Sequence, residues 1–164
     1  MPLEILRKIP LFSELNDDQL SRVQALCEQR TYAAGDKVIA EGQEGDEMFI
    51  VREGEVEVSK AISVQIPGQD RVNFEKQLVV LSAGNYFGEV ALLASDTRSA
   101  TVSARTDLNV WVLQGAPIQK LMAADPELGY RLLSVMSREL CVRLGRANED
   151  IRKLMTAFAI AINR

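Results

Sequence analysis

The spacing of hydrophobic residues changes twice along the chain. Up to about Arg30 they recur every three or four residues, which predicts helix, and Asn16 with Gln19 predicts a capped helix start. From Thr31 to about Leu113 short apolar stretches alternate with glycine turns, a pattern typical of strands. From Pro117 to Arg164 the helical spacing returns. The chain is therefore predicted to be a mainly β domain with helices before and after it.

The central strands should be short and joined by tight turns. The clearest runs from Met48 to Val58, where apolar residues alternate and Gly54 interrupts them as a turn. The stretch Ala61–Lys76 is polar, and we expect an extended hairpin or partly mobile loop without chemistry of its own. Many short strands of this kind imply a sandwich or barrel. The predicted segments are 1–30 (N-terminal helices), 31–116 (β-barrel) and 117–164 (C-terminal helices).

The last segment carries two predicted helices. Pro117 and Pro126 suit first-turn positions, and Asp125 suits the cap of the second helix. Small and apolar residues of that second helix then step by three and four, which makes a heptad seam of about two and a half repeats. The seam favours a homodimer through this helix, although a helix that packs on its own barrel would carry the same pattern. The seam residues are Leu144, Ala147, Ile151, Leu154, Phe158 and Ala161.

The bulk properties fit one cytoplasmic domain. A chain of 164 residues is the usual size for a single core. It has no run of about 18 apolar residues to span a bilayer and no secretory signal at its start, so we expect a cytoplasmic location without membrane contact. Cys27 and Cys141 lie far apart in helix-like segments, which favours reduced, half-buried thiols over a disulfide.

Charge and the missing histidine exclude several functions. A net charge of −4 argues against direct nucleic-acid binding, which normally uses a basic surface. The absence of histidine removes the commonest general base and metal ligand, and with them a cupin-type metal enzyme built on a small barrel. We therefore expect a non-enzymatic domain without a metal or cofactor.

One local segment carries anion-binding chemistry. Gly88 allows close backbone approach, and the next residues, Glu89 to Leu93, suit one helical turn whose first amides attract anions. Arg98, the only cation between Lys76 and Arg105, lies among small and apolar residues, where a guanidinium is costly unless it is paired. A bound cyclic phosphate would pair it, and so would an internal salt bridge to Glu89. The residues alone leave both explanations open.

The run FGEVALLASDTRSATV, residues 87–102, resembles the phosphate-binding cassette of cyclic nucleotide-binding domains. Members of that family include the regulatory subunits of protein kinase A and the bacterial catabolite activator. The resemblance extends to nearly the whole chain, because Ile9–Phe12 is similar to the family's opening segment and the glycines fall at its turn spacing. It implies a jelly-roll barrel, a double-stranded β-helix, with N-terminal and C-terminal helices as a movable lid. The glycines are Gly35, Gly42, Gly45 and Gly54.

The resemblance also implies how a ligand would be held. Glu89 would bind the ribose 2′-hydroxyl, Arg98 the exocyclic phosphate oxygens, and Gly88 would permit the ribose contact. The backbone amides of Ala91 and Ser99 would complete the phosphate cradle. The rest of the expected set comprises Val90 and Ala100 in the cassette, Leu78 and Val79 against the base, and Arg143 and Leu144 from the last helix. For Leu78 and Val79, plain core packing is the alternative.

Ser99 occupies the position that helps to discriminate the bases. Family members selective for the guanine ligand often carry threonine there and those selective for adenine often carry alanine, so serine is ambiguous. Similar bacterial activators pair a serine with the adenine ligand, which favours cyclic AMP (cAMP) over cyclic GMP (cGMP). The insertion Ala61–Lys76 departs from the family pattern and affects the rim more than the cradle.

The resemblance predicts a cyclic nucleotide receptor that converts ligand binding into movement of its C-terminal helices. One alternative is the sensor part of a larger transcription regulator, which needs roughly 60 to 80 further residues for a helix-turn-helix module. Another is a degenerate interaction domain whose pocket is filled by a side chain such as Leu144 or Met136. The downstream effector is left open.

Overall fold

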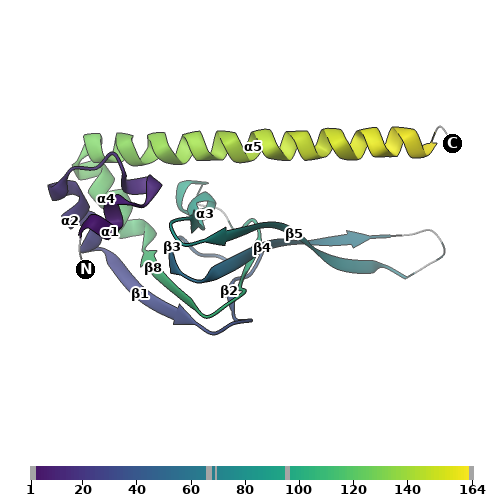
Figure 1. Cartoon of the computed structure of the whole chain (residues 1–164), viewed down its shortest axis with the longest axis horizontal. Coiled ribbons are helices and arrows are strands. Elements are labelled where there is room, and N and C mark those ends of the chain that lie inside the picture. The colour runs from purple at the N-terminus through teal and green to yellow at the C-terminus, as the bar shows by residue number, and fades with distance from the viewer. Residues whose placement is uncertain (1–2, 66–67, 69, 95–96, 163–164) are drawn as a thin grey trace.

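The computed structural model describes residues 3–65, 68, 70–94 and 97–162. Short helices precede a β-barrel, and a long helix runs along one side of it (Figure 1). The elements are α1 (Leu3–Arg7), η1 (Pro10–Phe12), α2 (Asp17–Gln24), β1 (Cys27–Tyr32), β2 (Lys37–Ile39), β3 (Met48–Glu53), β4 (Glu55–Val64), β5 (Val72–Ser82), β6 (Tyr86–Phe87), α3 (Glu89–Ala94), β7 (Thr101–Ala104), β8 (Leu108–Leu113), α4 (Gly115–Ala124) and α5 (Pro126–Ile162).

The strands form two antiparallel four-stranded sheets. Their orders are β1-β8-β3-β6 and β2-β7-β4-β5, which is the jelly-roll arrangement that the sequence predicted. Strand alternation explains the two cores. In β8, Val110 and Val112 pack between the sheets, whereas Trp111 and Leu113 pack against the helices. Strands β3 and β8 of the first sheet are therefore largely buried on both faces, and the outer face of this sheet carries the helical layer.

The N-terminal helices agree with the sequence only in part. The Asn16 side chain accepts a hydrogen bond from the Gln19 backbone amide at 2.9 Å, and the Gln19 side chain accepts one from the Asn16 backbone amide at 3.2 Å, so the predicted cap is confirmed. The helical interpretation up to Arg30 is wrong beyond Gln24, because β1 begins at Cys27. That strand pairs with β8 along its whole length, and long-range pairing overrides its weak local pattern.

The stretch Ala61–Lys76 is confirmed as an extended hairpin. Strands β4 and β5 pair from the barrel out to Val64 opposite Val72, and the hairpin projects well beyond the barrel (Figure 1). One register shift lies after Val58, where β5 carries an extra residue. Gly68, with φ +79°, lies beyond the paired strands.

The C-terminal helices begin as expected. The Asp125 side chain accepts a hydrogen bond from the Leu128 amide at 3.0 Å, which confirms the cap, and Pro126 is the first residue of α5. Helix α4 starts at Gly115, two residues before Pro117. Leu128, Leu132 and Met136 of α5 pack in the core with the N-terminal helices. The rest of α5 continues past the barrel (Figure 1).

The predicted seam is solvent-exposed in this structure. The exposed fractions of Leu144, Leu154 and Phe158 lie between 62% and 70%, so α5 does not use these residues to pack on its own barrel. The homodimer stays a prediction. Within the described residues, no helix is long and apolar enough to span a membrane. Both thiols are free, but Cys141 is exposed rather than half-buried, and Cys27 lies in a strand rather than a helix.

Candidate functional site

A sharp turn begins the cassette between β6 and α3. Gly88 has φ +85°, which favours glycine. A Cβ atom at this position would lie 2.8 Å from the Glu47 carbonyl oxygen and 2.9 Å from Arg98 Nη1. Gly88 therefore meets two demands at once, a left-handed backbone and close approach to a buried arginine.

The Arg98 side chain is buried, with 6% of it exposed. Its Nη1 donates hydrogen bonds to the Glu47 carbonyl at 2.7 Å and the Gly88 carbonyl at 3.3 Å, and the guanidinium lies 5.8 Å from the centre of the Phe49 ring. Burial lowers the pKa of Arg98, and the nearby carboxylates of Glu47 and Asp46 oppose that shift. Among the described residues, no carboxylate lies within 4 Å of its nitrogens to form an ion pair.

The Glu47 side chain anchors the segment that supports Arg98. Its Oε1 accepts hydrogen bonds from Arg30 Nη2 at 2.7 Å and from Gln114 Nε2 at 3.0 Å. Burial raises the pKa of Glu47, but the bonds from Arg30 and Gln114 outweigh it and lower the pKa overall. The carbonyl that holds Arg98 is thereby fixed to β1 and to the start of α4.

The Glu89 carboxylate is paired with α5. It is 3% exposed, and its Oε1 accepts a hydrogen bond from Arg143 Nη1 at 2.7 Å. Burial raises the pKa of Glu89, and the Arg143 charge opposes the rise. Arg143 also donates to Glu139 at 2.6 Å and lies over the Tyr86 ring at 5.5 Å. Among the described residues Glu89 thus pairs with Arg143, and the internal bridge to Arg98 is not formed.

A cavity of about 700 Å³ connects the cassette with the hairpin base and α5. This volume is in the range of small-molecule sites. Of the residues expected from the sequence, nine line it: Leu78, Val79, Gly88, Glu89, Val90, Arg98, Ser99, Ala100 and Arg143. Leu78 and Val79 are 55% and 40% exposed, so core packing does not describe them.

Two expected residues lie elsewhere. Leu144 is exposed on α5 and does not line the cavity, because it points away from the face that carries Arg143. The Ala91 backbone lies in the first turns of α3, where its amide remains a predicted contact.

Several residues that line the cavity were not among the site residues predicted from the sequence. From α5 they are Glu139, Val142, Arg146, Ala147 and Asp150, and from the barrel they include Lys60, Asn85 and Phe87. The α5 set with Arg143 is spaced by three and four residues, which is one face of a helix. The same spacing is present in the sequence, but the apolar residues of this helix were interpreted as a dimer seam and its cavity face was not predicted.

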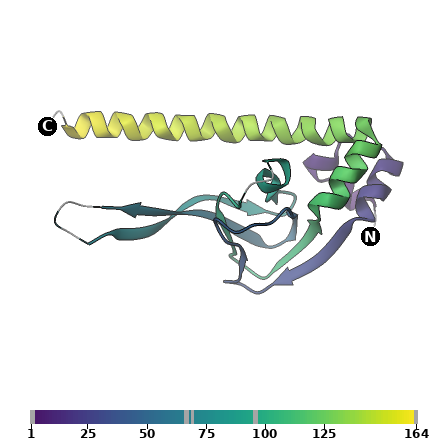
Figure 2. The same ribbon diagram turned by 180° about the vertical axis from the view of Figure 1, so that it is seen from behind.

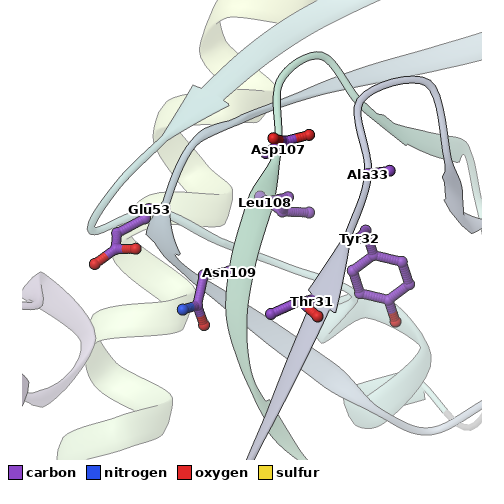
Figure 3. A pocket seen from close by; sticks show the side chains of 7 residues that line it. All are labelled: Thr31, Tyr32, Ala33, Glu53, Asp107, Leu108 and Asn109. Carbon is purple, nitrogen blue, oxygen red and sulfur yellow. The ribbon is translucent and has the colours of Figure 1, made fainter.

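A second hollow, of about 480 Å³, lies at the far end of β1 and β8 (Figure 3). It is open, and the charged residues among those that line it are Glu53 and Asp107. Two carboxylates without a cation repel a phosphate. The larger cavity, which Arg98 lines, is therefore the candidate anion site.

Residues 29–125 match the family described as "Cyclic nucleotide-binding domain". The chain belongs to this family. A cyclic nucleotide-binding domain is a regulatory unit that is not catalytic in itself. The matched range includes Gly88, Glu89 and Arg98 but ends before α5.

Individual relatives agree with this assignment. A cyclic nucleotide-gated potassium channel of Rhizobium etli is 34% identical over 125 residues, which cover 76% of this chain and 31% of the relative. A cAMP-dependent protein kinase regulatory subunit of Mycosarcoma maydis is 37% identical over 62% of this chain and 18% of its own. The catabolite activator protein of Thermus thermophilus superposes with a TM-score of 0.69 at 26% identity, over 88% of this chain and 62% of that one. The chain spans less than a third of the length of these two curated relatives.

Within this cyclic nucleotide-binding domain, Glu89 and Arg98 of the cassette have different structural roles. Arg98 is held by carbonyl oxygens of the barrel, whereas Glu89 is tied to the long helix. The cavity wall is thus shared between the matched domain and α5.

Proposed function

We propose that this domain binds cAMP in the cavity between the cassette and α5, and that binding shifts the position of α5. The observation that carries the proposal is the environment of Arg98. A buried guanidinium that lines a cavity and donates to carbonyl oxygens favours an anionic partner. A cyclic phosphate offers two oxygens in the geometry of the arginine fork, and charge-assisted hydrogen bonds of this kind are about twice as strong as neutral ones.

Glu89 is the proposed ribose contact. A carboxylate offers two oxygens with about four acceptor sites, so a sugar hydroxyl can donate to Glu89 while Arg143 keeps its bond to Oε1. A phosphate beside this carboxylate would be repelled. The position of Glu89 and Arg98 on one cavity therefore supports a ligand that presents a hydroxyl to one residue and an anion to the other.

The link to α5 runs through Arg143. A ligand that contacts Glu89 changes the environment of the carboxylate that holds Arg143. It thereby shifts the equilibrium between two positions of α5. Such a ligand shifts the balance only by the difference in its affinity for the two positions. The output of the domain is this movement, transmitted through α5 to a second copy of the chain or to a fused effector. In this proposal, the seam from Leu144 to Ala161 joins two copies.

Ser99 favours adenine as the base of the ligand, and therefore cAMP, with cGMP as the alternative. Its side chain is exposed and lines the cavity. A serine hydroxyl both donates and accepts hydrogen bonds, so it suits the phosphate or the base. The assignment to adenine comes from the resemblance to bacterial activators described above.

Calorimetric titration tests the proposal. Wild-type protein is titrated with cAMP, cGMP and 5′-AMP, and Arg98→Ala is compared with Arg105→Ala, an exposed arginine that pairs with Glu55. We expect Arg98→Ala to weaken cAMP binding about 10- to 100-fold, because it removes charge-assisted hydrogen bonds. Arg105→Ala should bind as the wild type does.

Each outcome has a definite meaning. Binding of 5′-AMP as tight as that of cAMP, or unchanged binding by Arg98→Ala, would refute the site. Tighter binding of cGMP than of cAMP would keep the site and replace the base assignment. Thermal unfolding of each variant shows whether a loss of binding reflects a loss of fold.

A further inference from the structure

The carbonyl group that holds Arg98 belongs to Glu47, a residue just outside the paired strands. The pairing of β3 with β8 begins at Met48, so Glu47 is the last residue of the preceding loop. Its carbonyl oxygen accepts a hydrogen bond from Arg98 at 2.7 Å, whereas the bond to the Gly88 carbonyl is 3.3 Å long. The side chain of Glu47 carries a carboxylate, which is a stronger acceptor for a guanidinium than a carbonyl is. The groups that direct this carboxylate elsewhere therefore affect Arg98.

Two side chains from neighbouring strands bind the Glu47 carboxylate. Arg30 lies in β1 and donates to Glu47 Oε1 at 2.7 Å, and Gln114, which directly follows β8, donates to the same oxygen at 3.0 Å. The sheet order β1-β8-β3 places the three residues on adjacent strands. Figure 2 shows β1 and β8 side by side at the end of the barrel where the chain enters α4. The pairing of the strands thus brings Arg30 to Glu47.

The Glu47 carboxylate and the Arg98 guanidinium influence each other. The Glu47 charge opposes the lowering of the Arg98 pKa by burial, and the Arg98 charge helps to lower the pKa of Glu47. Only a few single bonds separate the carboxylate from the carbonyl that Arg98 contacts, so a rotated Glu47 side chain would bring its carboxylate to the guanidinium. Among the described residues Arg98 has no such ion pair, and Glu47 Oε1 is bonded to Arg30 and Gln114 instead.

An ion pair between Glu47 and Arg98 would compete with a phosphate. Carboxylates and phosphates use the same paired donors of a guanidinium. A carboxylate bound to Arg98 would therefore have to be displaced before a phosphate could bind. The apparent affinity for the ligand falls in proportion to the fraction of molecules that are ready to bind it. A free Glu47 carboxylate beside Arg98 would thus act as an internal inhibitor.

We propose that Arg30 holds the Glu47 carboxylate away from Arg98 and thereby keeps the guanidinium available to the phosphate. The inference rests on the phosphate contact of Arg98 proposed above. Arg30 is a positioning residue that acts through Glu47, since the described wall of the cavity includes neither of them. Their side chains are 35% and 26% exposed, and a partly buried ion pair is screened less by salt than a fully exposed one.

Titration of Arg30 variants with cAMP tests this role. Arg30→Met removes the cation, and we expect it to weaken cAMP binding at least about tenfold, because the released carboxylate pairs with Arg98. Arg30→Lys keeps a cation for Glu47 and should lose less. The matched control is Arg52→Met, since the Arg52 side chain is 34% exposed and pairs with Glu53 on the same sheet. It should bind cAMP as the wild type does, and unchanged binding by Arg30→Met would overturn the proposal.

A second substitution separates positioning from general support of the fold. Glu47→Gln removes the competing carboxylate and keeps an amide oxygen that accepts from Gln114. In the Glu47→Gln background, Arg30→Met should therefore change cAMP binding by less than about threefold, against at least about tenfold in the wild-type background. Equal weakening in both backgrounds would mean that Arg30 supports only the structure, and the proposal would fail.

Urea unfolding without ligand distinguishes the role of Arg30 from the proposed binding of cAMP. The coupling between Glu47→Gln and Arg98→Met is measured by a double-mutant cycle, once in the wild type and once with Arg30→Met. We expect the coupling factor in the unfolding equilibrium to be at least about tenfold larger with Arg30→Met, because only then do Glu47 and Arg98 pair. Equal coupling would overturn the role of Arg30 whether or not cAMP binds. A wild type that does not bind cAMP, together with the larger coupling, would refute the site and keep the role of Arg30.

Discussion

Among single residues, the ion pair of Glu89 with Arg143 is the contact that ties the cassette to α5. Replacing Arg143 by Met leaves a buried carboxylate without its cation. Breaking a fully buried pair costs about 3–5 kcal/mol, and because a third of Arg143 is exposed we expect about 1–3 kcal/mol. Urea unfolding measures the loss. Adding Glu89→Gln to Arg143→Met should recover part of it, and strictly additive effects would contradict the coupling.

The same pair predicts a dependence on pH. Burial raises the pKa of Glu89, so this group stabilises the fold at low pH, and that contribution is lost as pH rises through the raised pKa. Without Arg143 the pKa should rise further. The deficit of Arg143→Met should therefore be smaller at about pH 5 than at about pH 8, and it should not depend on pH when Glu89→Gln is also present. A deficit that is equal at both pH values would argue against an ionised Glu89.

Residues near one another in the sequence were predictable at this scale, and distant partners were not. Gly88, Glu89 and Arg98 lie within eleven positions, so one local pattern pointed to all three. Arg143 follows Glu89 by 54 positions, and only the path of α5 over the cassette brings the two together. The sequence therefore left a Glu89–Arg98 bridge open, and the fold supplied a different partner.

At the scale of elements, the turn between β6 and α3 depends on Gly88. Gly84 is a matched control, because its φ of +87° is nearly the same but a Cβ atom there would meet nothing within 4 Å. Gly84→Ala should cost only the left-handed backbone, about 1–2 kcal/mol. Gly88→Ala should cost more in urea unfolding and should weaken cAMP binding at least about tenfold, because its Cβ would displace Arg98. Equal losses in both variants would show that the close approach is unimportant.

Local chemistry and distant pairing explain which elements could be predicted. The cap at Asn16, the cap at Asp125 and the hairpin are set by neighbouring residues, and each was confirmed. The start of β1 was misplaced because its pairing with β8 lies about 80 residues away. The exposed apolar strip of Ile62, Val64, Val72 and Phe74 on the hairpin was not predicted, because it forms only when β4 and β5 align in register and bring these residues onto one face.

At the scale of the whole molecule, α5 consists of two halves with different support. It has 37 residues, and its first turns hold Leu128, Leu132 and Met136 in the core. Beyond Gly145 the described side chains are exposed, including those of Arg146, Ala147 and Asp150, which line the open side of the cavity. In proteins most of the stability of a helix comes from packing of its apolar face rather than from its intrinsic propensity. The inner half is therefore supported by the fold, whereas support for the outer half would come from the second copy in the proposed dimer.

Hydrogen exchange measured at two protein concentrations tests this division. At low concentration, amides of residues 146–162 should exchange rapidly, because few contacts oppose local opening. At high concentration the proposed dimer should slow them at least about tenfold, since opening then requires dissociation. Amides near Leu132 should exchange slowly at both concentrations, as they lie beside the core. Rapid exchange of the outer half at every concentration would mean that a second copy does not cover it. Slow exchange at every concentration would place its support within one chain.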